Sequence, residues 1–311
     1  MLQERRIVVT GGAGFIGSHL TERLAAHNEV VVLDDVSVGK LANLGHLQDR
    51  VRVVKGSILD MRTVKRAMDR ANVVFHLAAL TSPTESMEQP LAYAEANVMG
   101  TINILTAARE AGAQRVVFAS TCAIYGRSPG PLREDLQPDP ISPYAVTKLA
   151  CEYFCRTLAG EGLEAVSLRL FNVYGPRQSP ESPYASVVAK FCEAARLTKK
   201  ATLYGDGTQT RDFVFVGDVA EAFELAAEAS GVGGEVINVG SGTSTSIQEL
   251  IRLIGDIRGR TLEFVPRSPR PGDILQSLAD PTRARRLLGF EPRTSLKEGL
   301  RQTLTAFGAL A

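Results

Sequence analysis

The sequence has few cysteines and histidines, the residues typical of zinc sites, and these are not grouped. Four cysteines and four histidines are spread over 311 residues, with no C-x-x-C pair and no Cys/His cluster that has the spacing of a zinc site. We therefore expect no metal. Cys151 and Cys155 are four residues apart on a probable helix, which favours small buried side chains over ligands. Free cysteines in a chain of this size are typical of a reducing compartment.

The sequence also lacks an excess of charge of one sign and any long apolar run. The formal net charge is +1, which argues against nucleic acid or a membrane surface as the main partner. The start, M-L-Q-E-R-R-I-V-V, lacks the apolar core of a signal peptide, and no apolar run approaches the roughly 20 residues of a membrane span. We expect a cytoplasmic protein of one large or two modest domains.

The first strong motif is a glycine-rich turn in V-V-T-G-G-A-G-F-I-G-S-H-L, between an apolar run and an amphipathic helical pattern. Gly11 allows a tight turn, Gly14 lets the backbone approach a pyrophosphate, and Gly17 lets the helix pack closely on the strand. The helix would present free N–H groups, from Phe15 and Ile16 onward, to the phosphates. The motif predicts a dinucleotide site.

Acidic residues after the next two strands refine this prediction. Residues 29–33 (E-V-V-V-L) form a second buried strand that ends at Asp34 and Asp35. A carboxylate here accepts hydrogen bonds from both ribose hydroxyls and repels a 2′-phosphate, which favours NAD over NADP. Asp34 is the first candidate and Asp35 its rival. A third strand leads to G-S-I-L-D, where we expect Ile58 and Asp60 near the adenine, although Asp60 can also cap the following helix.

A fourth strand is predicted over residues 73–77 (V-V-F-H-L). At its end, Leu77 and the small residues Ala78 and Ala79 leave room for a cofactor to lie against the backbone. His76 lies within the strand, and we interpret it as a buried structural histidine in preference to a catalytic one.

Residues 91–111 read as one long helix, with Asn97 near its middle as a further candidate cofactor contact. A fifth strand, 116–119, precedes Ser120, which is another. Strands and helices that alternate in this way predict an α/β protein with a Rossmann-type, doubly wound parallel sheet. Ligands of such sheets bind outside the carboxyl ends of the strands.

The stretch S-P-Y-A-V-T-K places Tyr144 and Lys148 four residues apart, on one face of a helix. A tyrosine has an ordinary pKa of about 10, too high for a base at neutral pH, and a nearby ammonium would lower it. The pair is common on helix surfaces, but downstream of a dinucleotide fold it favours proton exchange with a substrate hydroxyl.

The composition becomes loop-like after a sixth strand at 165–170. We predict an NAD-binding domain of residues 1–172 plus about 213–240, and a smaller, mostly C-terminal α/β substrate domain of about 173–212 and 241–311. In the smaller domain, Arg211 and Arg270 are candidates to clamp a diphosphate, since guanidinium groups make bidentate contacts with phosphate oxygens. The alternative is that each pairs with a neighbouring aspartate.

Together these segments resemble the extended short-chain dehydrogenase/reductase superfamily, and within it the NAD-dependent nucleotide-sugar 4-epimerases of the UDP-glucose or UDP-N-acetylglucosamine kind. The resemblance covers nearly the whole chain. Its motifs, in order, are T-G-G-A-G-F-I-G-S-H-L, H-L-A-A, S-T-C-A-I-Y-G, S-P-Y-A-V-T-K, L-F-N-V-Y-G-P, R-D-F-V-F-V-G-D-V-A and R-P-G-D.

The resemblance implies roles for individual residues. Tyr144 would be the general base and acid, Lys148 its partner and a ribose contact, and Thr121 a hydroxyl that bonds the reacting sugar. Contacts to the substrate would come from Asn172, Arg211, Arg270 and Asp273. Hydride would pass from C4 of a UDP-sugar to NAD, and the 4-keto sugar would turn and take the hydride back on its opposite face.

The resemblance also bears on rivals, substrate and assembly. Sugar dehydratases of the superfamily typically have Asp-Glu after the active-site threonine, whereas Cys122 and Ala123 stand here, which favours an epimerase over a dehydratase. A decarboxylase of the superfamily, which would need an acid beside the 5-carboxylate, is the other rival. A keto-reductase and a nucleotide-sensing regulator are less favoured. Ser277 is small where a large aromatic would restrict the pocket, so we expect N-acetylated UDP-sugars to be accepted. The resemblance further implies a homodimer through the helices around 91–111 and 144–160.

Overall fold

The computed structural model describes residues 2–47, 49–158, 160, 162–181, 185–269 and 274–310. Its largest feature is a seven-stranded sheet in the order β11-β7-β5-β4-β1-β2-β3, and every neighbouring pair is parallel. This confirms the predicted doubly wound parallel fold. The strands are β1 (Arg6–Thr10), β2 (Glu29–Asp34), β3 (Val51–Lys55), β4 (Val73–His76), β5 (Arg115–Thr121), β7 (Glu164–Leu170) and β11 (Val236–Val239).

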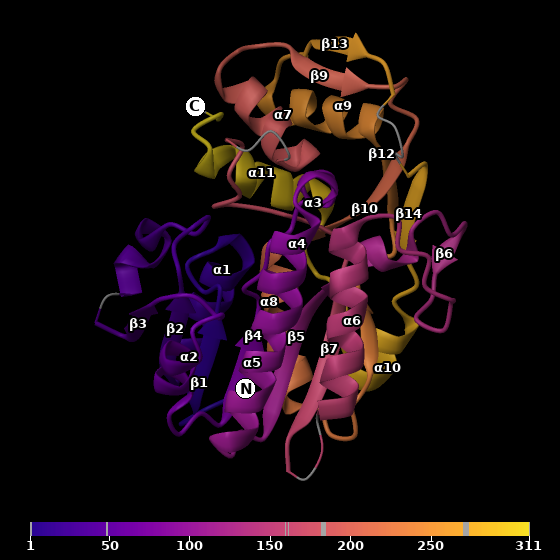
Figure 1. The fold of residues 1–311 in the computed structure, drawn as a ribbon. Coiled ribbons are helices and arrows are strands. Elements are labelled where there is room, and N and C mark those ends of the chain that lie inside the picture. Colours follow the sequence, from indigo (N-terminus) through magenta and orange to yellow (C-terminus); the bar gives the residue numbers. More distant parts are fainter. Residues whose placement is uncertain are drawn as a thin grey trace.

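Helices cover both faces of this sheet, and each face has its own apolar core. Side chains of α1, α8 and α10 pack on one face, and those of α2, α5 and α6 pack on the other. Figure 1 shows α5 and α6 side by side over the sheet. The helices are α1 (Phe15–Leu24), α2 (Met61–Met68), α5 (Gly100–Glu110), α6 (Pro143–Leu158), α8 (Val216–Glu228) and α10 (Thr282–Leu288).

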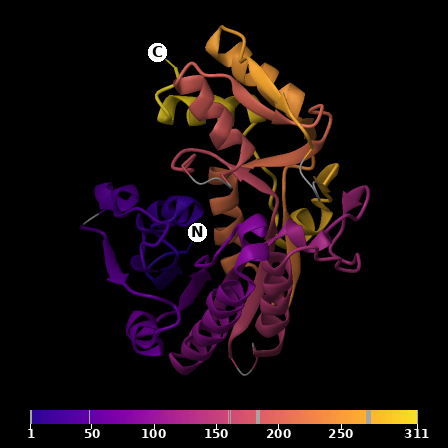
Figure 2. The ribbon, with the colours of Figure 1, turned by 45° about the horizontal axis from the view of Figure 1, so that its top comes forward.

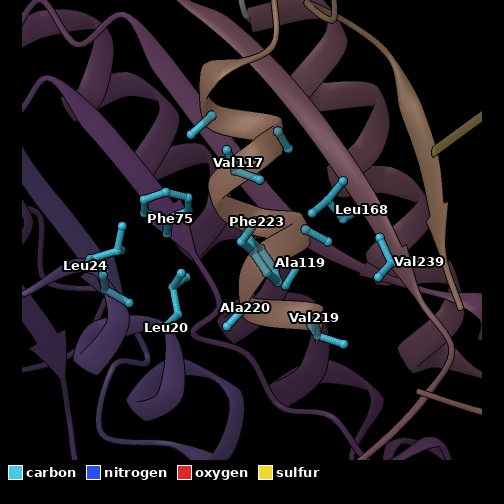
Figure 3. Close-up of a cluster of buried hydrophobic side chains, with 14 of the residues drawn as sticks. Leu20, Leu24, Phe75, Val117, Ala119, Leu168, Val219, Ala220, Phe223 and Val239 are labelled. Atoms are coloured by element: carbon cyan, nitrogen blue, oxygen red, sulfur yellow. The ribbon is translucent and has the colours of Figure 1, made fainter. Parts of the chain in front are cut away.

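The first of these cores is built around α8. Figure 3 shows Val219, Ala220 and Phe223 of this helix against strand residues and against Leu20 and Leu24 of α1. The Phe223 ring packs edge-on against Phe75 of β4, with centroids 6.3 Å apart. Because strands buried on both faces read as continuous apolar runs, the sequence pattern located them well.

The remaining elements form a smaller unit beyond the carboxyl ends of the large sheet's strands, as Figures 1 and 2 show. One sheet has the order β12-β10-β14-β6, with β8 also paired to β10, and a separate ribbon pairs β13 with β9. These elements are β6 (Pro131–Leu132), β8 (Asn172–Tyr174), α7 (Val187–Arg196), β9 (Ala201–Tyr204), β10 (Thr210–Phe215), β12 (Ser244–Ser246), α9 (Ile247–Arg258), β13 (Phe264–Arg267), β14 (Gln276–Ala279) and α11 (Leu296–Ala306).

Two features of the chain are less simple than the sequence suggested. The helical stretch 91–111 has a wider π turn, η2 (Ala94–Met99), between the short α4 (Pro90–Tyr93) and α5. The two-domain division stays a prediction, and elements on either side of it pack together. The strand β6 pairs with β14, and α10 contributes to the core on the large sheet.

Candidate active site

The glycine loop between β1 and α1 is a cradle of bare backbone. Gly11 has a φ of +70°, and a Cβ there would lie 2.8 Å from the amide nitrogen of Ala78. A Cβ on Gly17 would lie 2.1 Å from the carbonyl oxygen of Gly11. Gly14 begins α1 without any side-chain cap, so the first N–H groups, at Phe15 and Ile16, remain available. This arrangement fits the pyrophosphate of a dinucleotide.

Asp34 and Asp35, the rivals for the ribose, lie in different surroundings. Asp34 is buried at the tip of β2, and its two oxygens accept hydrogen bonds from the backbone N–H groups of Ala13, at 2.9 Å, and Val36, at 2.8 Å. Asp35 is exposed and accepts hydrogen bonds from Ser37. Since a carboxylate oxygen can accept more than one hydrogen bond, Asp34 can hold the glycine loop and still bind ribose hydroxyls.

The predicted adenine contacts lie at the end of β3. Asp60 is exposed and caps α2, where its carboxylate accepts a hydrogen bond from the backbone N–H of Arg62 at 3.1 Å. Ile58 is buried against the start of α5, where a Cβ on Gly100 would come within 2.4 Å of its side chain. The capping role of Asp60 is therefore visible, and an adenine contact remains a proposal.

The end of β4 lies directly beside the glycine loop. Leu77 and Ala78 contribute the backbone atoms nearest to Gly11, and Leu77, Ala78 and Ala79 are all partly buried. Asn97, from the π turn, is buried and does not point freely into this space. Its amide nitrogen donates to the carbonyl oxygen of Leu80, at 3.0 Å, and its amide oxygen accepts from the N–H of Leu80, at 2.8 Å.

Tyr144 and Lys148 lie one turn apart on α6, and both side chains are buried. The ammonium of Lys148 donates to the carbonyl oxygen of Ala119 at 2.9 Å and lies 4.7 Å from the centroid of the Phe118 ring. Burial lowers the pKa of Lys148 to about 8. The backbone N–H of Tyr144 donates to the hydroxyl of Ser86 at 3.1 Å, which ties the start of α6 to α3 (Pro83–Glu88).

Burial raises the pKa of the Tyr144 phenol above its usual value, and the hydrogen bond with Thr121 lowers it only in part. The sequence predicted a lowered pKa, set by Lys148. The physical reason for the difference is that burial penalises the phenolate, and the neighbouring Cys122 and Tyr93 raise the pKa further. A phenolate at neutral pH would need a further positive charge in the site.

Thr121 and Ser120 end β5 directly beneath Tyr144. The hydroxyl of Thr121 accepts a hydrogen bond from the N–H of Ala123 at 3.2 Å and caps the short turn η3 (Cys122–Tyr125). The hydroxyl of Ser120 donates to Glu152 at 2.5 Å. Glu152 forms a two-pronged ion pair with Arg169 at 2.8–2.9 Å, and both side chains are buried. The hydroxyl proton of Ser120 is therefore engaged, and a contact of Ser120 with a cofactor stays a prediction.

A pocket of about 700 Å³ opens between the two parts of the chain. Asn172 and Arg211 line it, as the sequence predicted for a diphosphate site. The amide of Asn172 donates to the backbone carbonyl of Asp212 at 3.1 Å, and the guanidinium of Arg211 donates to backbone carbonyls of Thr210 and Ile274. Other residues with polar or charged side chains that line the pocket are Ser82, Thr84, Ser186, Lys190, Glu193, Lys199, Lys200, Thr202, Tyr204 and Gln209.

A second pocket, of about 840 Å³, lies at the other end of the large sheet, beside Val73, Arg115 and Glu164. Strands β4, β5 and β7 begin there. Because parallel sheets bind ligands at the carboxyl ends of their strands, the pocket beside Arg211 is the candidate site.

Ser277 and Cys122, which the sequence associated with substrate choice, meet in the structure. Ser277 lies opposite Arg211 in the register of β10 and β14, and its hydroxyl donates to the sulfur of Cys122 at 4.0 Å. Burial raises the pKa of Cys122 to about 11, so its thiol stays neutral. Arg270 and Asp273, the two remaining predicted substrate contacts, lie outside the described residues.

Sequence reasoning missed several of these groups. The lysines of the pocket carried a weak signal, the pair Lys199 and Lys200 beside an apolar helix face. Glu152 carried a clearer one, because it lies four residues after Lys148 and so continues the face that holds Tyr144. Among the described residues, no group of acidic residues, cysteines and histidines could hold a metal ion.

Comparisons with known proteins agree with this geometry. Residues 7–240 match the model of the NAD dependent epimerase/dehydratase family. The chain belongs to this family. It is 41% identical to a UDP-glucose 4-epimerase of Mycolicibacterium smegmatis, over 97% of the chain and 98% of the relative. It is 35% identical to a UDP-N-acetyl-alpha-D-glucosaminuronate decarboxylase of Bacillus cytotoxicus, over 98% of each.

Among solved structures, the chain superposes on a UDP-N-acetylglucosamine 4-epimerase from Methanobrevibacter ruminantium, in complex with UDP-N-acetylmuramic acid. The TM-score is 0.93 at 36% identity, and the match covers 99% of both chains. The resemblance to extended short-chain dehydrogenases is thereby confirmed. In the described part of the chain, no helix has the length and apolar character needed to cross a membrane.

Proposed function

We propose that this chain is an NAD-dependent UDP-sugar 4-epimerase. The observation that carries the proposal is the convergence of three features at the carboxyl ends of the strands. The bare glycine cradle lies beside the end of β4, Tyr144 lies above Thr121 at the end of β5, and the pocket with Arg211 opens beside them. The hydroxyl of Ser86 connects the last two, because it holds Tyr144 from a helix whose first residues line the pocket.

NAD, when bound, would supply a positively charged nicotinamide ring that serves as hydride acceptor and then donor for C4 of the sugar. The chain's own residues hold the proton. Tyr144 accepts the proton of the 4-hydroxyl and returns it, and Thr121 orients that hydroxyl. The positive charge of the nicotinamide ring would stabilise the phenolate of Tyr144 and so offset the rise in its pKa that burial causes. Asp34, buried at the tip of β2, selects NAD by repelling a 2′-phosphate.

The pocket would hold the UDP part of the substrate. Arg211 and the nearby ammonium groups of Lys190 and Lys199 complement a diphosphate, and Asn172 supplies an amide at its edge. By resemblance to the family, Arg270 and Asp273 would also contact the substrate. We propose that the sugar lies toward Ser277 and Cys122, two small side chains that leave room for an N-acetyl group at C2. UDP-glucose, UDP-galactose and their N-acetylated counterparts are therefore all proposed substrates.

The rival reaction is dehydration or decarboxylation of a nucleotide sugar, and one of the relatives is a decarboxylase. Dehydration needs an additional acid and base beside the sugar. Ala123 has no proton to transfer, and burial raises the pKa of Cys122 to about 11, so the thiol is a poor base at neutral pH. These two residues favour epimerisation over dehydration.

We also propose that two copies of the chain associate through α6 and the helical stretch from α3 to α5, which lie side by side (Figure 1). Five large apolar side chains on these helices are at least half exposed: Met87, Leu91, Met99, Val146 and Tyr153. A patch of this kind is typical of an interface. Sedimentation of the purified chain should give twice its mass of 33.4 kDa. The four free cysteines support a reducing, cytoplasmic compartment.

The proposal is tested by Tyr144→Phe, which removes one hydroxyl and keeps the ring packed against Tyr93, 6.4 Å away. Turnover of UDP-sugars should fall by about 100-fold or more, the typical contribution of a general acid–base group, while NAD binding is retained. Tyr153→Phe, an exposed tyrosine on the same helix, is the matched control. A Tyr144→Phe variant with full activity would refute the mechanism.

A further inference from the structure

His76, the last residue of β4, is a buried titratable group that the reaction above does not use. Its side chain is 1% exposed. Its Nδ1 lies 2.7 Å from the hydroxyl of Thr10, at the end of β1, and its Nε2 lies 2.9 Å from the hydroxyl of Thr101, on α5. Both nitrogens are therefore engaged, one by the neighbouring strand β1 and the other by the helix α5.

The partners of the two hydroxyls determine the direction of every bond. Thr101 donates its only hydroxyl proton to the carbonyl oxygen of Asn97 at 2.6 Å, so its oxygen must accept a proton from Nε2 of His76. Because burial lowers the pKa of His76 and keeps the ring neutral, Nδ1 then carries no proton and accepts from Thr10. The oxygen of Thr10 accepts in turn from the N–H of Ala78 at 3.2 Å. The series therefore assigns the single proton of the neutral imidazole to Nε2.

The series of hydrogen bonds continues to α6, the helix that carries Tyr144. The amide nitrogen of Asn97 donates to the hydroxyl of Thr147 at 3.0 Å, and that hydroxyl donates to the carbonyl oxygen of Tyr144 at 2.8 Å. Asn97 also holds both backbone groups of Leu80. The polar side chains in this path are all buried: Thr10, His76, Asn97, Thr101 and Thr147. The path joins the segment after β4 to the turn of α6 that carries Tyr144.

We propose that His76 is a positioning residue, whose neutral imidazole sets the place of the cofactor-facing backbone at Ala78 relative to Tyr144. The inference rests on the proposed function. A hydride and a proton must leave one C4–OH group together, so the two groups that receive them need a fixed separation. An apolar residue at position 76 would fill the space but would leave the hydroxyls of Thr10 and Thr101 without their partner.

Two surrounding features keep the imidazole neutral. Burial first, and then the ammonium of Lys148, lower the pKa of His76 to about 3. The ring also lies against Phe118, with centroids 5.6 Å apart. In the purified wild-type chain, the ¹⁵N shifts of His76 should therefore show the Nε2–H form unchanged from about pH 5.5 to pH 8. This readout is independent of activity.

The variants His76→Leu, His76→Gln and His76→Asn separate the contributions of the two hydrogen bonds of His76, to Thr101 and to Thr10. Leucine removes both bonds. Glutamine places an amide near the position of Nε2 and keeps the bond to Thr101, and asparagine places one near Nδ1 and keeps the bond to Thr10. Thr101→Val cuts the same path without changing His76, and Thr101→Ser restores the hydroxyl. Val74→Ala, a buried change on the same strand, is the control for lost stability alone.

We expect His76→Leu and Thr101→Val to lower kcat by about 100-fold per folded, NAD-loaded site, with KM for the UDP-sugar within about twofold, because the pocket is untouched. His76→Gln, His76→Asn and Thr101→Ser should each lose less kcat than His76→Leu and Thr101→Val. Backbone amide exchange at Ala78 and Leu80 should accelerate in the first two variants and not in Val74→Ala.

Unchanged kcat per loaded site in both His76→Leu and Thr101→Val would overturn the proposal, as would equal amide exchange in Val74→Ala or an Nδ1–H form of His76. A wild-type chain without epimerase activity would instead refute the proposed function. In that case the tautomer and the exchange rates would still test the bonded path.

Discussion

Gly17→Ala is the substitution for which the structure sets the geometry most tightly. Gly17 lies in the first turn of α1, and its added Cβ would lie 2.1 Å from the carbonyl oxygen of Gly11, 2.8 Å from its carbonyl carbon and 2.9 Å from Cα of Gly12. Ordinary Cβ contacts are not shorter than 3.0 Å, so helix and loop must separate by about 1 Å. All of the atoms in the way are backbone, and no side chain can turn aside.

The magnitude follows from two opposing effects. Alanine is favoured over glycine within a helix by about 1 kcal/mol, whereas overpacking of this kind costs about 1–3 kcal/mol. The folded chain should therefore lose about 0–2 kcal/mol of stability. The displaced backbone is the loop that we propose to hold the pyrophosphate, so the strain should appear in NAD affinity. A loss of about 1.4–2.7 kcal/mol corresponds to a tenfold to hundredfold rise in Kd.

The assay is calorimetric titration of NAD into protein from which bound NAD has been removed, with circular dichroism to verify folding. Gly255→Ala is the matched control. It also replaces a glycine within a helix, α9, but its Cβ would lie 3.2 Å from the nearest atom, the carbonyl oxygen of Arg260. The control should bind NAD like the wild type. A folded Gly17→Ala variant with wild-type NAD affinity would refute the assignment of the loop.

Two other substitutions test the site on separate grounds. Burial lowers the pKa of Lys148 from 10.5 to about 8. The buried ammonium therefore destabilises the folded chain fully below pH 8, and this destabilisation falls as the pH rises toward 10.5. Lys148→Met should therefore raise the free energy of unfolding at pH 7 by on the order of 1–3 kcal/mol, and the Tm with it. The rise in the free energy of unfolding should be smaller at pH 10. The variant should have no turnover. Ser277→Tyr should lower kcat/KM for N-acetylated UDP-sugars at least about tenfold more than for the plain hexoses. A lower Tm for Lys148→Met at pH 7, or an unchanged substrate ratio for Ser277→Tyr, would contradict the respective argument.

The sequence predicted the large sheet and the positions of its strand ends because these depend on local patterns. Strands buried on both faces appear as short apolar runs, and the glycines and acidic residues that follow them mark the carboxyl ends. The helix 143–158 was predictable for the same reason, and with it the shared face of Tyr144 and Lys148. Local spacing correctly placed both side chains on one helix face.

The sequence could not predict what depends on contacts between distant segments. The π turn at Ala94–Met99 allows Asn97 to reach both Leu80 and Thr147, and no periodicity within 91–111 reveals it. The raised pKa of Tyr144 depends on how deeply its phenol is buried and on the neighbouring Thr121, Cys122 and Tyr93. The meeting of Ser277 with Cys122, 155 residues apart in the chain, likewise requires the folded structure.

The central claim is that the chain inverts C4 of a UDP-sugar. The most direct measurement incubates the purified protein with UDP-glucose, UDP-N-acetylglucosamine and UDP-glucuronate in turn and identifies the products by NMR. We predict conversion of UDP-glucose and UDP-N-acetylglucosamine to UDP-galactose and UDP-N-acetylgalactosamine without net consumption of NAD. A 4-keto-6-deoxy product, or release of carbon dioxide from UDP-glucuronate, would contradict it.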